Sequence, residues 1–241
     1  MRVLIVADIH ANYDALAALP DSDLTLCAGD TVTFGALPNE SLDWLRERRA
    51  LAIRGEEDDA VANGTFYRLP RHLEQAGIAS RAWTREKLAP ARATQLASLP
   101  PEYETVVDGR RIAMVHAYPG DYNRYLGPSD DELDRMTRAF PRAQIIVTAH
   151  NHRQSARRYH DKLIINPGSV GFSSKGGHAA FVTIEHGNVS FESVPYNVER
   201  AIERIRATTL TSDVQDACIR ELTEGSLRPR TRLPMRVSVP V

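Results

Sequence analysis

Short apolar runs rich in β-branched residues recur along the chain, and each ends abruptly at a polar residue or glycine. Runs of this length and composition are typical of buried strands. They predict strands at residues 3–7, 24–28, 51–54, 112–116, 145–148, 163–166, 179–184 and 188–194.

Helical patterns separate the early strands. We expect helices at residues 13–18 and 39–49, the second with Leu42, Trp44 and Leu45 on one side. Strand–helix alternation favours a largely parallel sheet in the first half of the chain. The second half instead predicts hairpins at residues 157–170 and 179–194, with a turn at His186-Gly187-Asn188. Further helices are expected at residues 197–207 and 212–222.

The chain shows no repeat or linker, so we expect one domain over residues 1–241. Residues 69–99 are predicted to form a helical cover over an open face, and residues 226–241 to form a C-terminal tail. The Arg- and Pro-rich sequence of residues 227–241 leaves three alternatives open: an edge strand, a free tail, or a contact between the subunits of a homo-oligomer.

Composition narrows the classes of function. Hydrophobic residues make up 42% and charged residues 25% of the chain, which is ordinary for a globular protein. A net charge of -1 gives no reason to expect bulk nucleic-acid or membrane binding, although a small phosphate-containing substrate remains compatible with it. Cys27 and Cys218 form no metal-binding pair or disulfide framework, which favours a reducing, cytoplasmic location.

Candidate metal ligands follow five of the predicted strands. The segments and their polar residues are VADIH with Asp8 and His10, CAGD with Asp30, RGEEDD with Glu56, Glu57 and Asp58, MVHA with His116, and TAHNH with His150 and His152. Residues two apart at a strand end are expected to project the same way. Ligands bind at the carboxyl ends of strands in open α/β sheets, so all five segments would meet at one edge.

Each of these segments alone has a simpler interpretation, since an Asp after a strand usually belongs to a turn or a helix cap. The acidic run at Glu56, Glu57 and Asp58 can be a solvated turn, part of a metal site or an altered active site. The joint set is harder to explain structurally. Imidazole and carboxylate ligands together suit Mn, Fe, Zn, Co or Ni, and more than four of them indicate two metals.

The ordered motifs D-I-H, G-D, G-E-E-D, H and A-H-N-H resemble those of the calcineurin-like metallophosphoesterases, whose corresponding pattern is D-x-H, G-D, G-N-H-D/E, H and G-H-x-H. The stretches GDTVTFGALPNESLDWLRER, AWTREKLAPARATQLASLP and INPGSVGFS look like the compact bacterial phosphodiesterase branch. Phe34 stands where the protein phosphatases of the superfamily carry Arg, which disfavours that branch. The resemblance implies a four-layer αββα sandwich of two mixed β-sheets flanked by helices.

The resemblance also implies a dinuclear site. One metal would be held by Asp8, His10, Asp30 and His152, and the other by Asp30, Glu56, His116 and His150. Two divalent cations are expected, Mn first among Mn, Fe, Zn, Ni and Co. Glu57 occupies the position of the family's catalytic His, and Asp58 is expected to orient an imidazole ligand. Ala149 replaces a glycine of the pattern.

The function implied is hydrolysis of phosphodiesters, nucleotide-type esters among them, by attack of a metal-bridging hydroxide in which Asp8, His10, Asp30 and Glu57 take part. The alternative is a weak or inactive relative that binds a metal, a nucleotide or a protein partner, because Gly55-Glu56-Glu57-Asp58 departs from the family motif.

Residues outside these motifs leave further alternatives open. Asn12 either reaches a substrate phosphate or caps the following helix, and Arg124 either meets a substrate anion or is a solvated surface residue. His72, His160 and His186 are expected to be ordinary surface histidines.

Overall fold

A computed structural model describes residues 1–241 apart from 123, 125, 128, 226–235 and 239–241. Its six-stranded mixed sheet has the order β11-β10-β9-β1-β2-β3. The strands are β1 (Arg2–Val6), β2 (Leu24–Cys27), β3 (Leu51–Ala52), β9 (His178–Glu185), β10 (Asn188–Pro195) and β11 (Arg236–Ser238). β1, β2 and β3 run parallel, as predicted for the first half of the chain, and β9 and β10 form a predicted hairpin.

The second sheet is also mixed, with the order β4-β5-β6-β8-β7. Its strands are β4 (Glu102–Val107), β5 (Arg110–Val115), β6 (Ile145–Val147), β7 (Gln154–Tyr159) and β8 (Lys162–Pro167). The central strands β5, β6 and β8 run parallel, whereas β4 and β7 pair antiparallel at the edges. β7 and β8 form the other predicted hairpin.

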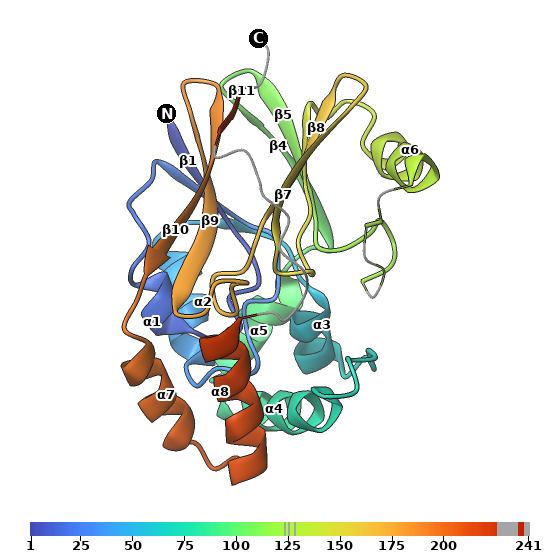
Figure 1. Cartoon of the computed structure of the whole chain (residues 1–241). Coiled ribbons are helices and arrows are strands. Elements are labelled where there is room, and N and C mark those ends of the chain that lie inside the picture. Colours follow the sequence, from blue (N-terminus) through green and yellow to red (C-terminus); the bar gives the residue numbers. More distant parts are fainter. Residues whose placement is uncertain (123, 125, 128, 226–235, 239–241) are drawn as a thin grey trace.

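The two sheets pack face to face over a core to which both contribute. Ile5 and Val182 of the first sheet and Met114 and Val147 of the second belong to this shared core. The outer face of the six-stranded sheet is covered by α1 (Tyr13–Leu16) and α2 (Pro38–Glu47), and that of the five-stranded sheet by α6 (Asp130–Ala139) (Figure 1). The predicted four-layer αββα sandwich is confirmed.

The remaining helices gather at the end of the sheets where β1 and β2 finish (Figure 1). They are α3 (Glu56–Asn63), α4 (Glu74–Lys87), α5 (Pro90–Ser98), α7 (Val198–Arg206) and α8 (Ser212–Glu224). The predicted helical cover at residues 69–99 is divided into α4 and α5, because Pro90 begins a new helix. None of the helices in the described ranges has the length and apolar character needed to cross a membrane.

The sequence patterns missed β4, α6 and α3. β4 lies at a sheet edge with exposed Glu104 and Val106, so it lacks an apolar run. α6 begins at a Ser129 cap whose side chain accepts from the Glu132 N–H, a signal that S-x-x-E offers. The acidic run expected as a possible turn is the first turn of α3, where the positive end of the helix dipole favours carboxylates.

The C-terminal residues are described only in part. Residues 236–238 form β11 and pair antiparallel with β10, which favours the edge-strand alternative for this short stretch. The rest of the predicted tail, residues 226–235 and 239–241, lies outside the described residues.

Candidate metal centre

The candidate ligands come from the ends of strands in both sheets. Asp8 follows β1, Asp30 follows β2, Glu56 follows β3, His116 follows β5 and His150 follows β6. Carboxylate oxygens and imidazole nitrogens of these residues, with His10 and His152, form three overlapping groups in which all atoms lie within 4.8 Å of one another. Residues as distant in the sequence as Asp8 and His152 therefore meet at one place.

The backbone turns sharply at these strand ends. Asp8, His10, Asp30, His150 and His152 all have left-handed φ values, between 50° and 69°. We expected residues two apart to project together because they would continue an extended strand, and that reason is wrong. The residues instead lie in tight left-handed turns, and these turns bring their side chains together. Non-glycine residues rarely hold this conformation, and such strain concentrates at functional sites.

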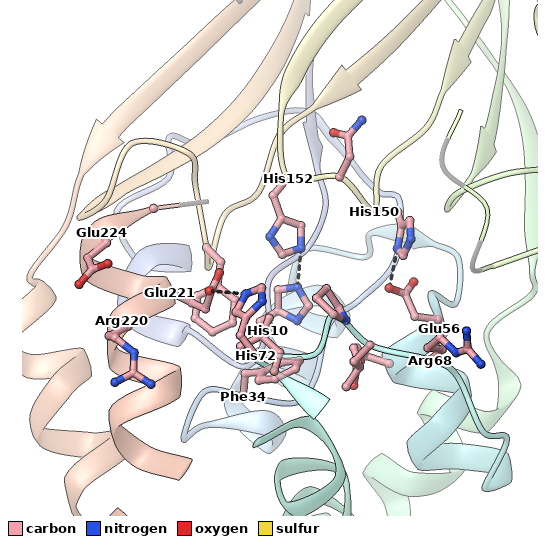
Figure 2. A pocket seen from close by; sticks show the side chains of 17 residues that line it. His10, Phe34, Glu56, Arg68, His72, His150, His152, Arg220, Glu221 and Glu224 are labelled. Carbon is pink, nitrogen blue, oxygen red and sulfur yellow. Dashed lines mark hydrogen bonds and ion pairs between the residues drawn. The ribbon is translucent and has the colours of Figure 1, made fainter. Parts of the chain in front are cut away.

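The first ligand group consists of Asp8, His10 and His152. The Nε2 atoms of His10 and His152 lie 3.0 Å apart (Figure 2). The His10 ring stacks on Phe172 at a centroid distance of 5.0 Å, which fixes its plane. Burial lowers the pKa of both imidazoles below 6.5, so each is held neutral, the form that binds metals.

The second group consists of Glu56, His116 and His150. The Glu56 carboxylate lies between the two imidazoles, with Oε2 2.6 Å from His116 Nε2 and Oε1 2.5 Å from His150 Nδ1 (Figure 2 draws the second contact). His116 Nδ1 lies 2.6 Å from the Ala28 carbonyl oxygen, so it donates there and directs Nε2 into the site.

The charges of this group depend on one another. Burial raises the pKa of Glu56, but His150 and His116 outweigh it and bring that pKa well below 4.5. Burial likewise lowers the pKa of His116, but Asp30 and Glu56 raise it well above 6.5. Without a metal, a glutamate anion and a His116 cation therefore stabilise each other.

Asp30 lies between the two groups. Its Oδ2 atom is 3.5 Å from His116 Nε2, and its Oδ1 atom accepts a 2.9 Å hydrogen bond from the Glu57 backbone N–H. Gly55 makes this approach possible, because a Cβ at that position would lie 2.1 Å from Asp30 Oδ1. The glycine of the acidic motif is therefore required by the site itself.

The donor set fits divalent cations. Asp8 Oδ2 and Asp30 Oδ2 are buried and accept no hydrogen bond from the described residues. Burial raises the pKa of Asp8 well above 3.8, a further sign that positive charge is needed beside it. Buried carboxylate oxygens without hydrogen-bond partners are costly unless a cation compensates them. Carboxylate oxygens and neutral imidazoles at these spacings are suitable ligands for Mn or similar metals.

Glu57 lies at the site but is engaged with a cation of the protein. Arg81 of α4 donates to both of its carboxylate oxygens, with Nε–Oε2 at 2.8 Å and Nη2–Oε1 at 2.5 Å. Burial raises the pKa of Glu57 to about 7, and the Arg81 guanidinium opposes that shift. The motifs gave no indication of Arg81, because it lies 24 residues downstream in a helix without a motif of its own.

Asp58 does not orient an imidazole, so that expectation is wrong. Its Oδ1 accepts from the backbone N–H groups of Thr31 and Val32, and its Oδ2 accepts from the Gly55 N–H. Burial raises the pKa of Asp58 to about 8, and these backbone donors oppose that shift. Through these three backbone donors, Asp58 ties the loop after β2 to the start of α3.

The two candidate substrate-binding residues lie outside the cavity described below. Asn12 caps α1 by accepting from the Ala15 N–H, and its amide donates to Gly171 O and the Tyr196 hydroxyl, so the capping alternative is the one observed. The Arg124 guanidinium pairs with Glu132 at 3.2 Å and lies over the Tyr118 ring.

A cavity of about 420 Å³ opens from the ligand groups. His10, Glu56, His150 and His152 form one part of its lining. The lining also includes residues that the sequence did not indicate as part of a cavity: Phe34 and Phe172, residues 68–70, 72 and 73 before α4, and Arg220, Glu221 and Glu224 of α8 (Figure 2 shows many of them). His72 is exposed as predicted, yet it also lines the cavity and lies 3.4 Å from Glu221.

Comparison with known proteins identifies related sequences and folds. Residues 1–188 match the model of the calcineurin-like phosphoesterase superfamily domain. An uncharacterized protein of Methanocaldococcus jannaschii is 26% identical, in a match that covers 84% of this chain and 91% of that protein.

Two crystal structures share the fold. A metallophosphoesterase from Sphaerobacter thermophilus is 23% identical with a TM-score of 0.73, over 92% of this chain and 99% of that one. A hypothetical protein from Pyrococcus horikoshii is 20% identical with a TM-score of 0.77, over 93% and 98% of the two chains.

Metal binding should strengthen with pH. A cation that takes the His116 Nε2 lone pair must displace the proton that Asp30 and Glu56 stabilise there, so acid competes with the metal. Competition with a fluorescent chelator should show tighter Mn²⁺ binding at about pH 8 than at about pH 6. His186→Ala, in the β9–β10 turn, should bind as the wild type does. A pH-independent affinity would contradict this ligand assignment.

Breaking the Glu57–Arg81 pair should destabilise the fold. Arg81→Met leaves a buried carboxylate uncompensated, so we expect a loss of about 3–5 kcal/mol in the free energy of urea unfolding. The double variant Glu57→Gln/Arg81→Met removes both charges and should recover a large part of that loss. A single variant within about 1 kcal/mol of wild type would show that the pair is not needed.

Proposed function

The chain belongs to the calcineurin-like phosphoesterase superfamily, and we propose that it is a metal-dependent phosphodiesterase acting on esters with good leaving groups. The observation that carries this proposal is that the two ligand groups open into one cavity and are linked by a third group, Asp8, Asp30 and His116, which overlaps both. A structural cluster of buried charges would need neither the overlap of the groups nor an opening to solvent.

We assign one divalent cation to Asp8, His10, Asp30 and His152 and a second to Asp30, Glu56, His116 and His150. When bound, such a pair activates a water at neutral pH and neutralises charge on the phosphoryl oxygens. Manganese is the first choice, because it accepts both carboxylate and imidazole ligands. The buried free cysteines are in keeping with a reducing, cytoplasmic setting.

The protein's own groups set the geometry of the reaction. Asp8 and Asp30 supply fixed negative charge, and Phe172 and the Ala28 carbonyl hold the rings of His10 and His116. Preorganised ligands lower the cost of bringing charges together during the reaction. Because these groups are buried and constrained, the site is set before substrate arrives.

Glu57 has a positioning role in this proposal rather than an acid role. Both of its oxygens accept from Arg81, and its N–H donates to Asp30. The histidine that the family pattern has at this position would donate a proton to the leaving alkoxide. The Glu57–Arg81 ion pair does not favour that step. Substrates whose leaving group departs as a stable anion, such as aryl esters, need no such proton.

One observation favours the alternative of a weak or inactive relative. Glu56 approaches both His116 and His150 within hydrogen-bonding distance, so its carboxylate competes with a cation for the same imidazoles. Glu56 also adds a negative charge where the family pattern has a neutral amide, which weakens a bound metal as a Lewis acid. Activity measurements on variants of this residue distinguish the two functions.

Purified protein loaded with Mn²⁺ should hydrolyse bis(4-nitrophenyl) phosphate. Asp30→Asn should lower kcat/KM by more than about a hundredfold, since even the loss of an outer partner of a ligand typically costs about 10–100-fold. His186→Ala serves as the control and should retain wild-type activity. A folded, metal-occupied wild type without turnover for any divalent metal would overturn the enzymatic proposal.

The activity of Glu56 variants should depend on whether the new side chain keeps an oxygen ligand. Glu56→Asn keeps an oxygen donor and should stay within about tenfold of wild type, whereas Glu56→Ala should fall by more than about tenfold in kcat/KM. The same Mn²⁺-dependent assay measures both. A gain of more than about a hundredfold in Glu56→Asn would instead identify the natural residue as a damaged ligand and favour the inactive alternative.

A further inference from the structure

The cavity extends well beyond the ligand groups. Its volume of about 420 Å³ lies in the range of sites that hold whole small molecules rather than a single phosphoryl group. Beyond the ligands, its lining comes from residues 68–70, 72 and 73 and from the end of α8. A substrate held at the ligand groups would therefore place its remaining portion against these residues.

Arg68 sits on a segment that is fixed on both sides. Before it, the Tyr67 hydroxyl donates to Asp59 at 2.7 Å, and the Tyr67 carbonyl accepts from Arg81 at 3.1 Å. After it, Leu69 packs against Gly77 of α4, where a Cβ would lie 2.0 Å from its Cδ1 atom. The backbone that carries Arg68 is therefore held in place next to the cavity.

The Arg68 guanidinium is exposed and has no hydrogen bond or ion pair with any described residue, although it lines the cavity. Arg81 and Arg124, in contrast, are engaged by Glu57 and Glu132. Arg220 also lines the cavity, but it comes from α8 together with the acids of that helix (Figure 2). Arg68 is therefore the cation of the cavity wall best placed to meet a negative group of a ligand.

We propose that Arg68 is a specificity-determining residue that selects phosphodiesters whose retained portion carries a second anionic group, a carboxylate or a further phosphate. This inference rests on the proposed function and names the substrate class of the same site. Leu69, Pro70 and Leu73 provide an apolar wall along the same segment. The favoured substrate thus combines an apolar body with a negative charge beyond the scissile ester.

A matched pair of substrates isolates that charge. 4-Nitrophenyl phenyl phosphate and 4-nitrophenyl 3-carboxyphenyl phosphate share the leaving group and differ by one carboxylate. The Mn²⁺-loaded wild type should prefer the carboxylate ester by about fivefold in kcat/KM, the size expected for an exposed charge pair. Added salt should reduce the preference, because it screens exposed charges.

Variants at Arg68 and Arg71 test whether the preference for the carboxylate ester depends on Arg68. Arg68→Gln should abolish it, and Arg68→Lys should keep part of it because the charge remains. Arg71→Gln is the control: Arg71 is exposed on the same segment but does not line the cavity, so the preference should stay. A wild type without the preference, or an Arg68→Gln variant that keeps it, would overturn the inference.

A binding measurement separates this inference from the proposed function. Calorimetry of the Mn²⁺-loaded protein with phenylphosphonate and 3-carboxyphenylphosphonate needs no turnover. Absent turnover together with tighter binding of the carboxylate compound in wild type, lost in Arg68→Gln, would sink the phosphodiesterase function and support the role of Arg68. Turnover with equal kcat/KM for the two esters and equal binding of the two phosphonates would do the reverse.

Discussion

Three buried carboxylates, those of Asp8, Asp30 and Glu56, surround the single imidazole of His116, and this concentration of negative charge is the constraint on which the site depends. Like charges at such spacing repel strongly in a medium from which water is excluded. His116 compensates part of the charge by holding a proton. Two divalent cations would compensate the remaining negative charge. The need for metal ions therefore arises from the way the fold places these carboxylates.

Local contacts of the fold stabilise the acidic residues around the site. The first turn of α3 places Glu56 at the positive end of a helix dipole, and Asp58 uses backbone donors to hold that helix against the loop after β2. Arg81 compensates Glu57 from a neighbouring helix and also holds the Tyr67 carbonyl. The same guanidinium thus links Glu57 to the segment that carries Arg68 on the cavity wall.

Sequence patterns predicted most of the strands and the polar residues at their ends, because short apolar runs followed by polar residues are local signals. The two-sheet sandwich followed from the resemblance to the calcineurin-like metallophosphoesterases. They failed where the decisive partner is distant in sequence. Arg81 has no motif, and nothing local indicated that Glu57 would be engaged by it. For Arg124 the sequence left a substrate contact and a solvated surface position open, and nothing local indicated its pairing with Glu132. The start of α3 at Glu56 was missed although an acidic first turn is itself a helix signal.

Whether Glu56 is a metal ligand or a replacement for one decides between the two proposed functions. Anomalous diffraction from Mn²⁺-soaked crystals can show which of the two it is. As a ligand, Glu56 should contact one manganese peak together with His116, in place of the present carboxylate–imidazole contacts, and a second peak should contact Asp8 and His10. A Glu56 side chain still lying against its imidazoles, with no manganese peak between them at saturating metal, would rule out this ligand role.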